Sequence, residues 1–451
     1  MEVLNAYKEA FLHLPEGIDA AEAVAETEAE QTVTLAKGVH NGSAFSDVTS
    51  LFVRTQGEKA GFAYTQNLDE DPADVLARAY ESSKYAQTEG MPIPETGEFT
   101  YTLKEETCEL TELAVLWKKA EQTDQWLNSQ FPELTVQKLS VTDRIRTVSV
   151  VSSKGTDCRT SSHCFCVSVF ASDVRYPGSF LIRELTAVSL EELRPEQWNR
   201  VVQRWYWTLE AQKQECDDFE SGMYRCVLDG SVLNNIFLTG WRMFAAGNYK
   251  KSTTPFAGKM QEKIASFVVN ITDCAVRDGS GYVYRADCEG IKGSKAVLVS
   301  DGIMKGCISS MKDCDRGCST GNAGRKDMIS GTIHTDVVTM PKNFGMEPGK
   351  GLLETLLEKM NDGMYIYESY DMFHSVNTVS GDYAIPCNGI RIKDGKPAGV
   401  IKGLTLNGRV QNLLQEIEEL DSEISVQPML MLNSFTVSAP DALVHKLSIS
   451  R

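Results

Sequence analysis

The sequence has no long hydrophobic run and no leader-like start. No uninterrupted apolar stretch approaches the roughly 18 residues that a membrane-spanning helix needs. The N-terminal residues MEVLNAYKEAFLHLPEG lack the basic start and the continuous apolar core of a signal peptide. We therefore expect a cytoplasmic protein with no membrane partner.

Clusters of positive charge are absent as well. The chain carries 45 Lys and Arg against 62 Asp and Glu, a formal net charge of −17. Proteins that bind nucleic acid neutralise phosphates with clustered basic side chains. We therefore expect no direct contact with nucleic acid, and the acidity is explained most simply by solubility.

Common nucleotide and zinc motifs are missing. The sequence contains neither a phosphate-binding P-loop nor a Gly-x-Gly-x-x-Gly fingerprint after a strand. It has six histidines, of which the closest two are 27 residues apart and none precedes a Glu. No helix turn can therefore present two imidazoles to one zinc ion. A site built from distant residues, such as His334 with His374, is the less favoured alternative.

Twelve cysteines are dispersed along the chain, and reduced thiols packed as small apolar side chains are the default interpretation. Cys164 and Cys166 fall on one face of an alternating segment, which favours core packing. One denser group is an alternative metal or redox site, although its closest pair is Cys-x-x-x-Cys and not the Cys-x-x-Cys of zinc ribbons. Its members are Cys288, Cys307, Cys314 and Cys318.

Two segments carry a family resemblance. The first, DCEGIKGSKAVLVSDGIMKGCISSMKDCDRGCSTGNAGR, has an acidic-x-Glu-Gly turn, a strand with a Gly-bearing hairpin, and a closing Gly-Asn-x-x-Arg element. The second, SVNTVSGDYAIPCNGIRIKDGKPAGVIKGLTLNG, has a Ser-Gly-Asp-Tyr element. Their order resembles the TldD/PmbA family, with Ser380 standing where that family more often has Thr. The matching residues are Asp287, Glu289, Gly290, Asp301, Gly302, residues 319–325, Asn377, Ser380, Gly381, Asp382, Gly389 and the hairpin at residues 393–396.

The resemblance implies a non-catalytic member of that family. The family pairs a zinc peptidase subunit, TldD, which carries His-Glu-x-x-x-His and a Cys near its C-terminus, with a metal-free subunit, PmbA or TldE. Neither feature occurs here, and the last cysteine is Cys387. A helix expected from Ser231 to about Ala246 corresponds in order to the metal-bearing helix. Its polar members, Asn234, Asn235 and Arg242, are no zinc ligand set.

The same resemblance assigns partners and cofactors. It implies no catalytic residue, no metal and no cofactor in this chain, with zinc only on a TldD-like partner. The expected partners are that subunit or a second copy of the chain, together with unfolded peptides. The family's older label, modulator of DNA gyrase, is compatible with contact to a protein.

The candidate residues for the peptide cavity or signature loop are ten of the matching ones. Asp287 and Glu289 form an acid/base pair in one interpretation and accept backbone N–H groups of a tight turn in the favoured one. Arg325 either binds a peptide carboxylate or forms an internal ion pair, and both alternatives stay open. The full set is Asp287, Glu289, Gly290, Thr320, Gly321, Asn322, Arg325, Asn377, Gly381 and Asp382.

The sequence of the N-terminal half predicts strands flanked by helices. A hairpin turning at Gln56-Gly57 joins Ala44–Arg54 to Glu58–Gln66. Ala20–Gln31 is ambiguous, because its Ala and Glu content favours a helix whereas the family pattern places a strand there. Further expected elements are helices Ala73–Gln87 and Leu110–Phe131 and strands Thr135–Ser140, Arg144–Ser152, Arg159–Ala171 and Phe180–Val188.

A further helix is expected after these strands. It carries a stripe of apolar side chains at helical spacing, which is more typical of a core than of a ligand platform. The stripe consists of Trp198, Val201, Val202, Trp205 and Leu209.

The C-terminal half predicts mostly strands with inserted helices. The expected strands are Ser266–Ile271, Ala296–Ser300 and Gly363–Tyr367, and a helix is expected over Leu352–Asn361. The fold class is therefore α+β in two domains. Residues 1–214 form an antiparallel sheet with helices, and residues 215–451 form a β-rich domain that carries the signature.

Three functional hypotheses follow. The first is a non-catalytic subunit of a heteromeric zinc metallopeptidase that degrades or matures peptides and contributes to the peptide cavity. The second is a stand-alone homodimer that binds peptides without protease activity. The third and weakest is a metal or redox protein that uses the cysteine group.

Overall fold

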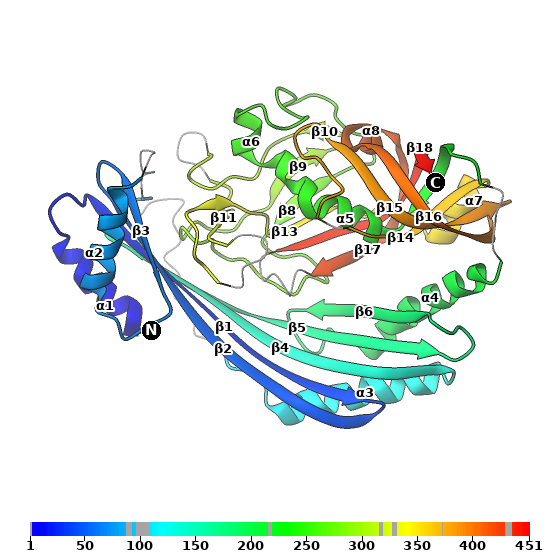
Figure 1. Cartoon of the computed structure of the whole chain (residues 1–451), viewed down its shortest axis with the longest axis horizontal. Coiled ribbons are helices and arrows are strands. Elements are labelled where there is room, and N and C mark those ends of the chain that lie inside the picture. Colours follow the sequence, from blue (N-terminus) through cyan, green and yellow to red (C-terminus); the bar gives the residue numbers. More distant parts are fainter. Residues whose placement is uncertain are drawn as a thin grey trace.

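The computed structural model describes residues 2–86, 93–95, 108–214, 219–314, 319–326, 332–371, 373–428 and 435–451. Two large sheets dominate, one of six strands and one of ten. Figure 1 shows the six-stranded sheet as a long curved layer beneath the C-terminal sheet. The predicted α+β class, with an antiparallel N-terminal sheet and a β-rich C-terminal part, is confirmed.

The N-terminal sheet has the order β3-β2-β1-β4-β5-β6 and is antiparallel throughout. The predicted hairpin at Gln56-Gly57 is present between β2 and β3. The two segments expected at Thr135–Ser140 and Arg144–Ser152 are one continuous strand, because the residues between them stay paired to both neighbours. The strands are β1 Ala20–Ala36, β2 Val39–Gln56, β3 Ala60–Thr65, β4 Leu134–Ser152, β5 Asp157–Asp173 and β6 Phe180–Ala187.

Strand β1 resolves the ambiguity over Ala20–Gln31 in favour of a strand. Successive side chains of a strand point to opposite faces. On one face Ala21 and Ala23 are buried against α1 and α2, and on the other Glu22 and Glu26 are buried beside cationic side chains. Burial on both faces outweighs the local helix propensity of these residues.

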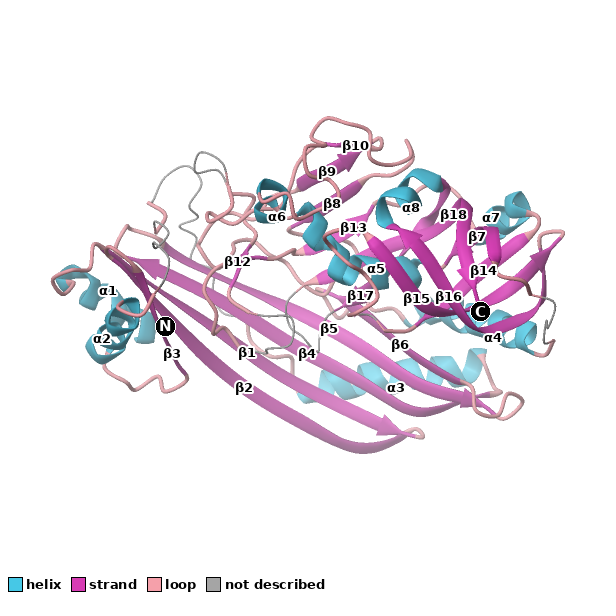
Figure 2. Cartoon of the chain, turned by 45° about the horizontal axis from the view of Figure 1, so that its top comes forward, coloured by secondary structure: helices cyan, strands magenta, loops and turns pink. Residues whose placement is uncertain are grey.

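Helices cover one face of the N-terminal sheet (Figure 2). Helix α2 starts at Pro72, where the Asp71 carboxylate accepts the Ala73 N–H at 2.9 Å. Trp198 and Val202 of α4 are buried with the side chains of α3 and the sheet, which confirms the core interpretation of the tryptophan stripe. The helices are α1 Glu2–Ala10, α2 Pro72–Ser83, α3 Leu113–Gln130 and α4 Trp198–Gln212, with 3-10 turns at Phe11–His13 and Pro195–Gln197.

The C-terminal sheet runs β10-β9-β8-β13-β18-β16-β15-β14-β7, with β17 paired to β18. The strand expected at Ser266–Ile271 is wrong, since residues 266–269 form a turn closed by the Val269 N–H on the Ser266 carbonyl. Its strands are β7 Gly222–Leu228, β8 Ile271–Cys274, β9 Ala296–Ser300, β10 Ile303–Met304, β13 Asn343–Met346, β14 Gly363–Ser369, β15 Asp382–Lys393, β16 Lys396–Arg409, β17 Ile417–Pro428 and β18 Thr436–Ser450, and a separate pair joins β11 Ala323–Gly324 to β12 Val338–Thr339.

The helix expected from Ser231 to about Ala246 is broken into three pieces. Ala245 has an extended backbone (φ −80°, ψ 130°) that interrupts it. The pieces are α5 Gly230–Gly240, a 3-10 turn at Trp241–Phe244 (η3) and α6 Ala246–Lys250, and the remaining helices of this half are α7 Leu353–Met360 and α8 Val410–Glu416.

Helix α4 touches both halves of the molecule. Its Arg204 forms ion pairs with Asp229 and Asp441 of the C-terminal half. Its Trp207 ring lies 5.3 Å from the Tyr365 ring, centroid to centroid. The helix therefore fixes the C-terminal sheet against the N-terminal one.

Candidate functional site

Asp287 organises the turn that opens the signature region. Its Oδ1 accepts the N–H groups of Glu289 and Ile291, each at 2.9 Å. Its Oδ2 accepts the Ala323 N–H at 2.9 Å, which ties the turn to the second half of the signature. This is the favoured structural role, in which a carboxylate accepts backbone N–H groups of a tight loop.

Gly290 and Glu289 complete the turn. Gly290 has φ +73°, and a Cβ there would lie 2.6 Å from the Cγ2 of Thr156, in the turn between β4 and β5, so only glycine fits. The buried Glu289 accepts the Met311 N–H at 2.9 Å through Oε2. Burial, and then the neighbouring Asp287 carboxylate, raise the pKa of Glu289 to about 8.

The Thr320–Asn322 element holds the loop from inside. The Asn322 Nδ2 donates to Asp273 Oδ2 at 2.6 Å and to the Met340 carbonyl at 2.8 Å. The Thr320 hydroxyl donates to the Asn322 Oδ1 at 2.7 Å. Gly321 has φ +71° and approaches the Lys292 carbonyl too closely for a Cβ. These residues therefore build the loop through contacts within the C-terminal half.

Arg325 forms an internal ion pair, which settles the question left open by the sequence. Its guanidinium is fully buried and pairs with Glu22 of β1. It also lies over the Phe52 ring, 4.5 Å from the centroid. Glu22 in turn faces Arg54 Nε at 3.0 Å. One carboxylate of the N-terminal sheet thus lies between two arginines from different halves.

A row of glutamates on β1 continues this contact. We call Glu22, Glu26, Glu28 and Glu30 the β1 glutamate row. Lys326 pairs with Glu26 and, at 2.8 Å, with Glu28. The β4 arginines complete the pattern, with Arg146 Nη2 at 2.6 Å from Glu26 and Arg144 paired to Glu30. The row therefore joins the N-terminal sheet to the signature loop by buried charge.

The two central glutamates have opposite pKa shifts. Burial acts to raise the pKa of Glu26, but Arg146 and Lys326 outweigh it and the pKa falls. The pKa of Glu28 is raised by burial first and by Glu26 second. Beside them lies a cavity of about 30 Å³ that Glu26, Asp287 and Lys326 help to line. It has room for one or two waters and not for a peptide residue.

The second signature segment forms a separate turn beside α8. Asn377 Oδ1 accepts the Val379 N–H at 2.9 Å, and the Gly381 N–H donates to the Asn377 carbonyl at 2.8 Å. Gly381 has φ +82°, and the exposed Asp382 pairs with Arg409 Nε at 2.8 Å. Within the described residues no hydrogen bond or ion pair links this turn to the first segment. The peptide-cavity role of both sets stays a prediction.

No metal site emerges from the described part of the chain, where no group of three or more His, Cys, Asp or Glu side chains could hold an ion. Cys288 is buried and Cys307 and Cys314 are partly buried, whereas Cys318 lies outside the described residues. The exposed His374 pairs with Asp371 at 2.8 Å. In the same described part, no helix has the length and apolar character needed to cross a membrane.

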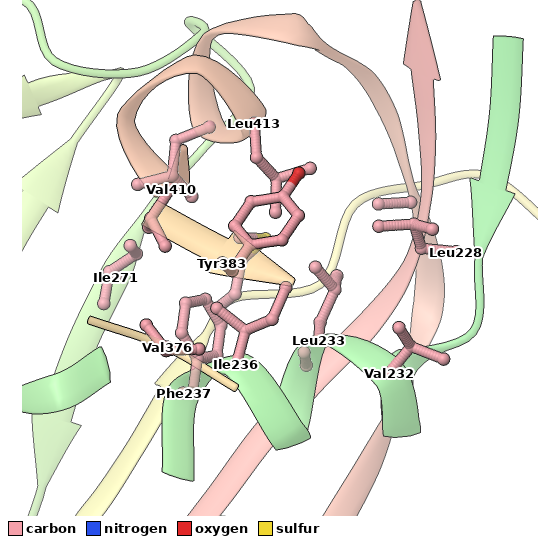
Figure 3. Packing of buried hydrophobic residues seen from close by; sticks show 14 of the residues in the cluster. Leu228, Val232, Leu233, Ile236, Phe237, Ile271, Val376, Tyr383, Val410 and Leu413 are labelled. Atoms are coloured by element: carbon pink, nitrogen blue, oxygen red, sulfur yellow. The ribbon is translucent and has the colours of Figure 1, made fainter. Parts of the chain in front are cut away.

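Helix α5, which corresponds in order to the family's metal-bearing helix, is packed for stability. Figure 3 shows Leu233, Ile236 and Phe237 pointing into the apolar core with Tyr383 and Val410. The buried Asn234 donates to the Ser425 carbonyl at 2.9 Å, and Asn235 donates to the Ser369 hydroxyl at 2.6 Å. Residues 230–250 contain no His, Cys, Asp or Glu. These side chains do not fit a zinc site.

The fold and site thus define a class of protein: a two-sheet α+β chain whose halves are joined through a buried signature loop. Residues 221–451, about half of the chain, match the model described as PmbA/TldA metallopeptidase C-terminal domain. The chain therefore belongs to the TldD/PmbA family.

Similar proteins agree with this membership. A metalloprotease of Methanocaldococcus jannaschii is 28% identical over 38% of this chain and 37% of its own length. A metalloprotease of Methanothermobacter thermautotrophicus is 29% identical over 37% of this chain and 35% of its own length. The chain thus matches little more than a third of each relative.

Solved structures match over almost the whole chain. TldE from Thermococcus kodakarensis superposes with a TM-score of 0.81 at 20% identity and covers 99% of this chain and 100% of its own. A proposed modulator of DNA gyrase from Thermotoga maritima has a TM-score of 0.80 at 19% identity, with the same coverage. At this identity the likeness shows the fold alone.

The β1 glutamate row and its arginine partners were missed in the sequence. Their signal is the spacing of two, since Glu26, Glu28 and Glu30 alternate along β1 and Arg144 and Arg146 alternate along β4. Glu28 lies opposite Arg146 and Glu30 opposite Arg144 in the sheet. Period-two charge in an Ala-rich segment indicates a strand with one charged, partnered face.

Proposed function

We propose that this chain is the non-catalytic subunit of a heteromeric TldD/PmbA-type zinc metallopeptidase and contributes to its peptide cavity. The proposal rests on one observation, the kinds of side chain found in α5, η3 and α6. Residues 230–250 supply no His, Cys, Asp or Glu, so the zinc and the water it activates belong to a partner subunit that bears His-Glu-x-x-x-His.

The family membership supports the peptidase part of this proposal. Relatives of the chain carry the name metalloprotease, and the superposed Thermococcus kodakarensis protein carries the name TldE. A chain without zinc ligands in α5 acts on peptides by binding them and by shaping the cavity in which the partner cleaves.

Strand β6 offers an edge to which an extended peptide can add. It pairs only with β5 in the described structure. Thr186 of β6 donates to the Gly279 carbonyl of the C-terminal half at 2.7 Å, so residues two and four positions earlier on β6 share that inward face. One of them, Ile182, is 61% exposed. Main-chain hydrogen bonds to such an edge bind peptides with little sequence preference.

The test is purification of the tagged chain from its native host, with the copurifying proteins identified by mass spectrometry. We expect one stoichiometric partner, a family member that bears His-Glu-x-x-x-His. The matched control is the same tagged chain with Ile182→Lys. If the β6 edge binds peptides and not the partner subunit, this variant copurifies with the same partner. Recovery of the chain without any such relative would contradict the proposal.

The alternative is a stand-alone homodimer that binds peptides without cleaving them. It is favoured by residues 39–50 of β2, whose outer edge has no strand partner among the described residues and suits association of two copies. Peptide binding measured on the isolated chain separates the two. The alternative expects full affinity without a partner, whereas the subunit proposal expects affinity to rise when the partner is added.

A further inference from the structure

The chain contains three Asn-Gly pairs, which lie in different surroundings. They are Asn41-Gly42 in β2, Asn388-Gly389 in β15 and Asn407-Gly408 in β16. Asparagine is chemically labile, and it can lose its side-chain amide most readily ahead of a glycine. The next backbone nitrogen then reaches the side-chain carbonyl carbon without a Cβ in the way. Whether a given pair reacts therefore depends on how freely its side chain and backbone can move.

Asn41 is the extra residue of a β-bulge near the start of β2. Thr34 of β1 lies opposite Gly42 and Leu35 lies opposite His40, so Asn41 has no cross-strand partner in β1. On the other side of β2, strand β3 pairs only with residues 51–56. Figures 1 and 2 show β2 at the outer margin of the sheet. The backbone at Asn41 therefore lies at an irregular step of the ladder and is not held by strands on both sides.

The side chain of Asn41 has no contact that would hold it in place. Every residue from 39 to 48 is exposed, and the Asn41 amide makes no hydrogen bond to another described residue. Gly42 has φ +145°, and a Cβ placed on it would meet nothing within 4 Å. The amide of Asn41 and the backbone of Gly42 are therefore both open to water.

The other two asparagines are held by hydrogen bonds. Asn388 is 8% exposed. Its Nδ2 donates to Glu368 Oε2 at 3.1 Å, and its Oδ1 accepts the Gly403 N–H at 3.1 Å. It also lies at a register shift, so it shows a bulge without exposure. The Asn407 Nδ2 donates to the Thr405 carbonyl at 3.0 Å within a regular part of the sheet. Of the three, Asn41 alone combines a bulge, exposure and an unbonded amide.

We propose that Asn41 is a site of spontaneous deamidation in the folded protein. Hydroxide removes the Gly42 N–H proton, the Gly42 nitrogen attacks the Asn41 Cγ, and ammonia leaves after taking a proton from water. Water then opens the cyclic succinimide at either carbonyl, which yields aspartate or isoaspartate. The product adds one negative charge to a stretch, residues 39–50, whose only acidic residue is Asp47. The assignment goes beyond the proposed function, because it does not depend on peptide binding.

The first test incubates the full folded chain at mildly alkaline pH and follows it by peptide mapping with mass spectrometry. Deamidation replaces an amide by a carboxyl group and raises the mass by about 1 Da. We expect this gain on the peptide that contains Asn41, with Asn388 and Asn407 unchanged. In the same chain kept unfolded in urea, all three sites are expected to react together, because the fold no longer distinguishes them. Enzymatic methylation of isoaspartyl carboxylates counts the isoaspartate formed.

The second test uses two variants, each expected to lose the mass gain on this peptide. Gly42→Ala places a Cβ beside the attacking nitrogen. Asn41→Gln keeps the glycine, so it controls for the strain that alanine brings at a positive φ, and its longer side chain must close a larger ring. A folded wild type whose Asn41 stays intact while the unfolded chain reacts would overturn the assignment. So would reaction of Asn388 or Asn407 as early as Asn41, or a gain that persists in Asn41→Gln.

Discussion

At the scale of the residue, the buried ion pair between Arg325 and Glu22 joins the C-terminal half of the chain to the N-terminal sheet. Both side chains are buried, and Arg325→Met removes one of the two cations beside Glu22 while Arg54 Nε stays at 3.0 Å. We expect Arg325→Met to lower the free energy of unfolding by about 1.5–3 kcal/mol, because a buried charge-assisted contact is lost. Chemical denaturation followed by fluorescence measures the change.

The matched control is Arg409→Met. Arg409 also pairs with an acidic side chain, Asp382, but both side chains are more than half exposed, and exposed pairs contribute roughly 0–1 kcal/mol. Equal effects of the two substitutions would show that Arg325 is stabilised by packing on Phe52 and not by its charge.

Glu289 makes the stability of the protein depend on pH. Burial and then Asp287 raise the pKa of Glu289 from 4.5 to about 8. A raised carboxyl pKa contributes stability that is complete below pH 4.5 and is lost as the pH rises through 8. Glu289→Gln keeps an acceptor for the Met311 N–H but does not titrate. We therefore expect wild type to lose stability relative to this variant between about pH 4.5 and about pH 8, with little further change above pH 8.

The measurement is a series of unfolding curves of both proteins across that range. A difference that stays flat, or that grows in favour of the wild type at high pH, would mean that Glu289 is ionised throughout and is held by Arg54. The opposite slope is the one that burial of a carboxyl group predicts.

At the scale of the element, the outer edge of β6 is the part of the N-terminal sheet where we expect a peptide to add. Phe180→Lys with Ile182→Lys places two charges on its inward, exposed face. We expect peptide affinity of the complex with its partner to fall about tenfold, or about 1.4 kcal/mol, whereas Val174→Lys, at an exposed position in the turn after β5, leaves it unchanged. Fluorescence anisotropy with a labelled unfolded peptide checks this, and equal affinities would move the peptide to another edge.

The helices and strands also show how much of the fold can be predicted from the sequence. The hairpin at Gln56-Gly57 and helix α2 follow from local turn and capping chemistry, and both are where the sequence predicts them. The strand nature of Ala20–Gln31 depends on cations contributed by β2, β4 and residues 325–326, which no local propensity contains. The wrong strand at Ser266–Ile271 has the composition of a strand but no neighbour to pair with until Ile271.

The candidate site, like the fold, could be predicted from the sequence only in part. The backbone-binding role of Asp287 follows from an acidic residue ahead of a Gly-bearing turn. The pairing of Arg325 with Glu22 joins residues 303 positions apart, and such a contact is set by the packing of the two sheets. Sequence reasoning therefore recovered the loop and missed the surface that the loop binds.

At the scale of the whole molecule, two sets of buried charges hold the halves together. One is the β1 glutamate row with residues 325–326, and the other is Arg204 of α4 with Asp229 and Asp441. We expect the wild type to unfold in one calorimetric transition. Combining Glu22→Gln with Arg204→Met removes one contact from each set and is expected to split the transition into two. A single transition in the double variant would show that apolar packing alone couples the halves.

The central claim is that this chain is a subunit of a zinc peptidase and does not itself bind the zinc ion. The most direct measurement is hydrolysis of an unfolded peptide by the purified chain, by a family member bearing His-Glu-x-x-x-His, and by the two mixed, all with zinc supplied. We predict no turnover by the chain alone, turnover by the mixture, and loss of that turnover when the partner's motif Glu is replaced by Gln. Turnover by the chain alone that requires zinc and withstands repurification would contradict the account.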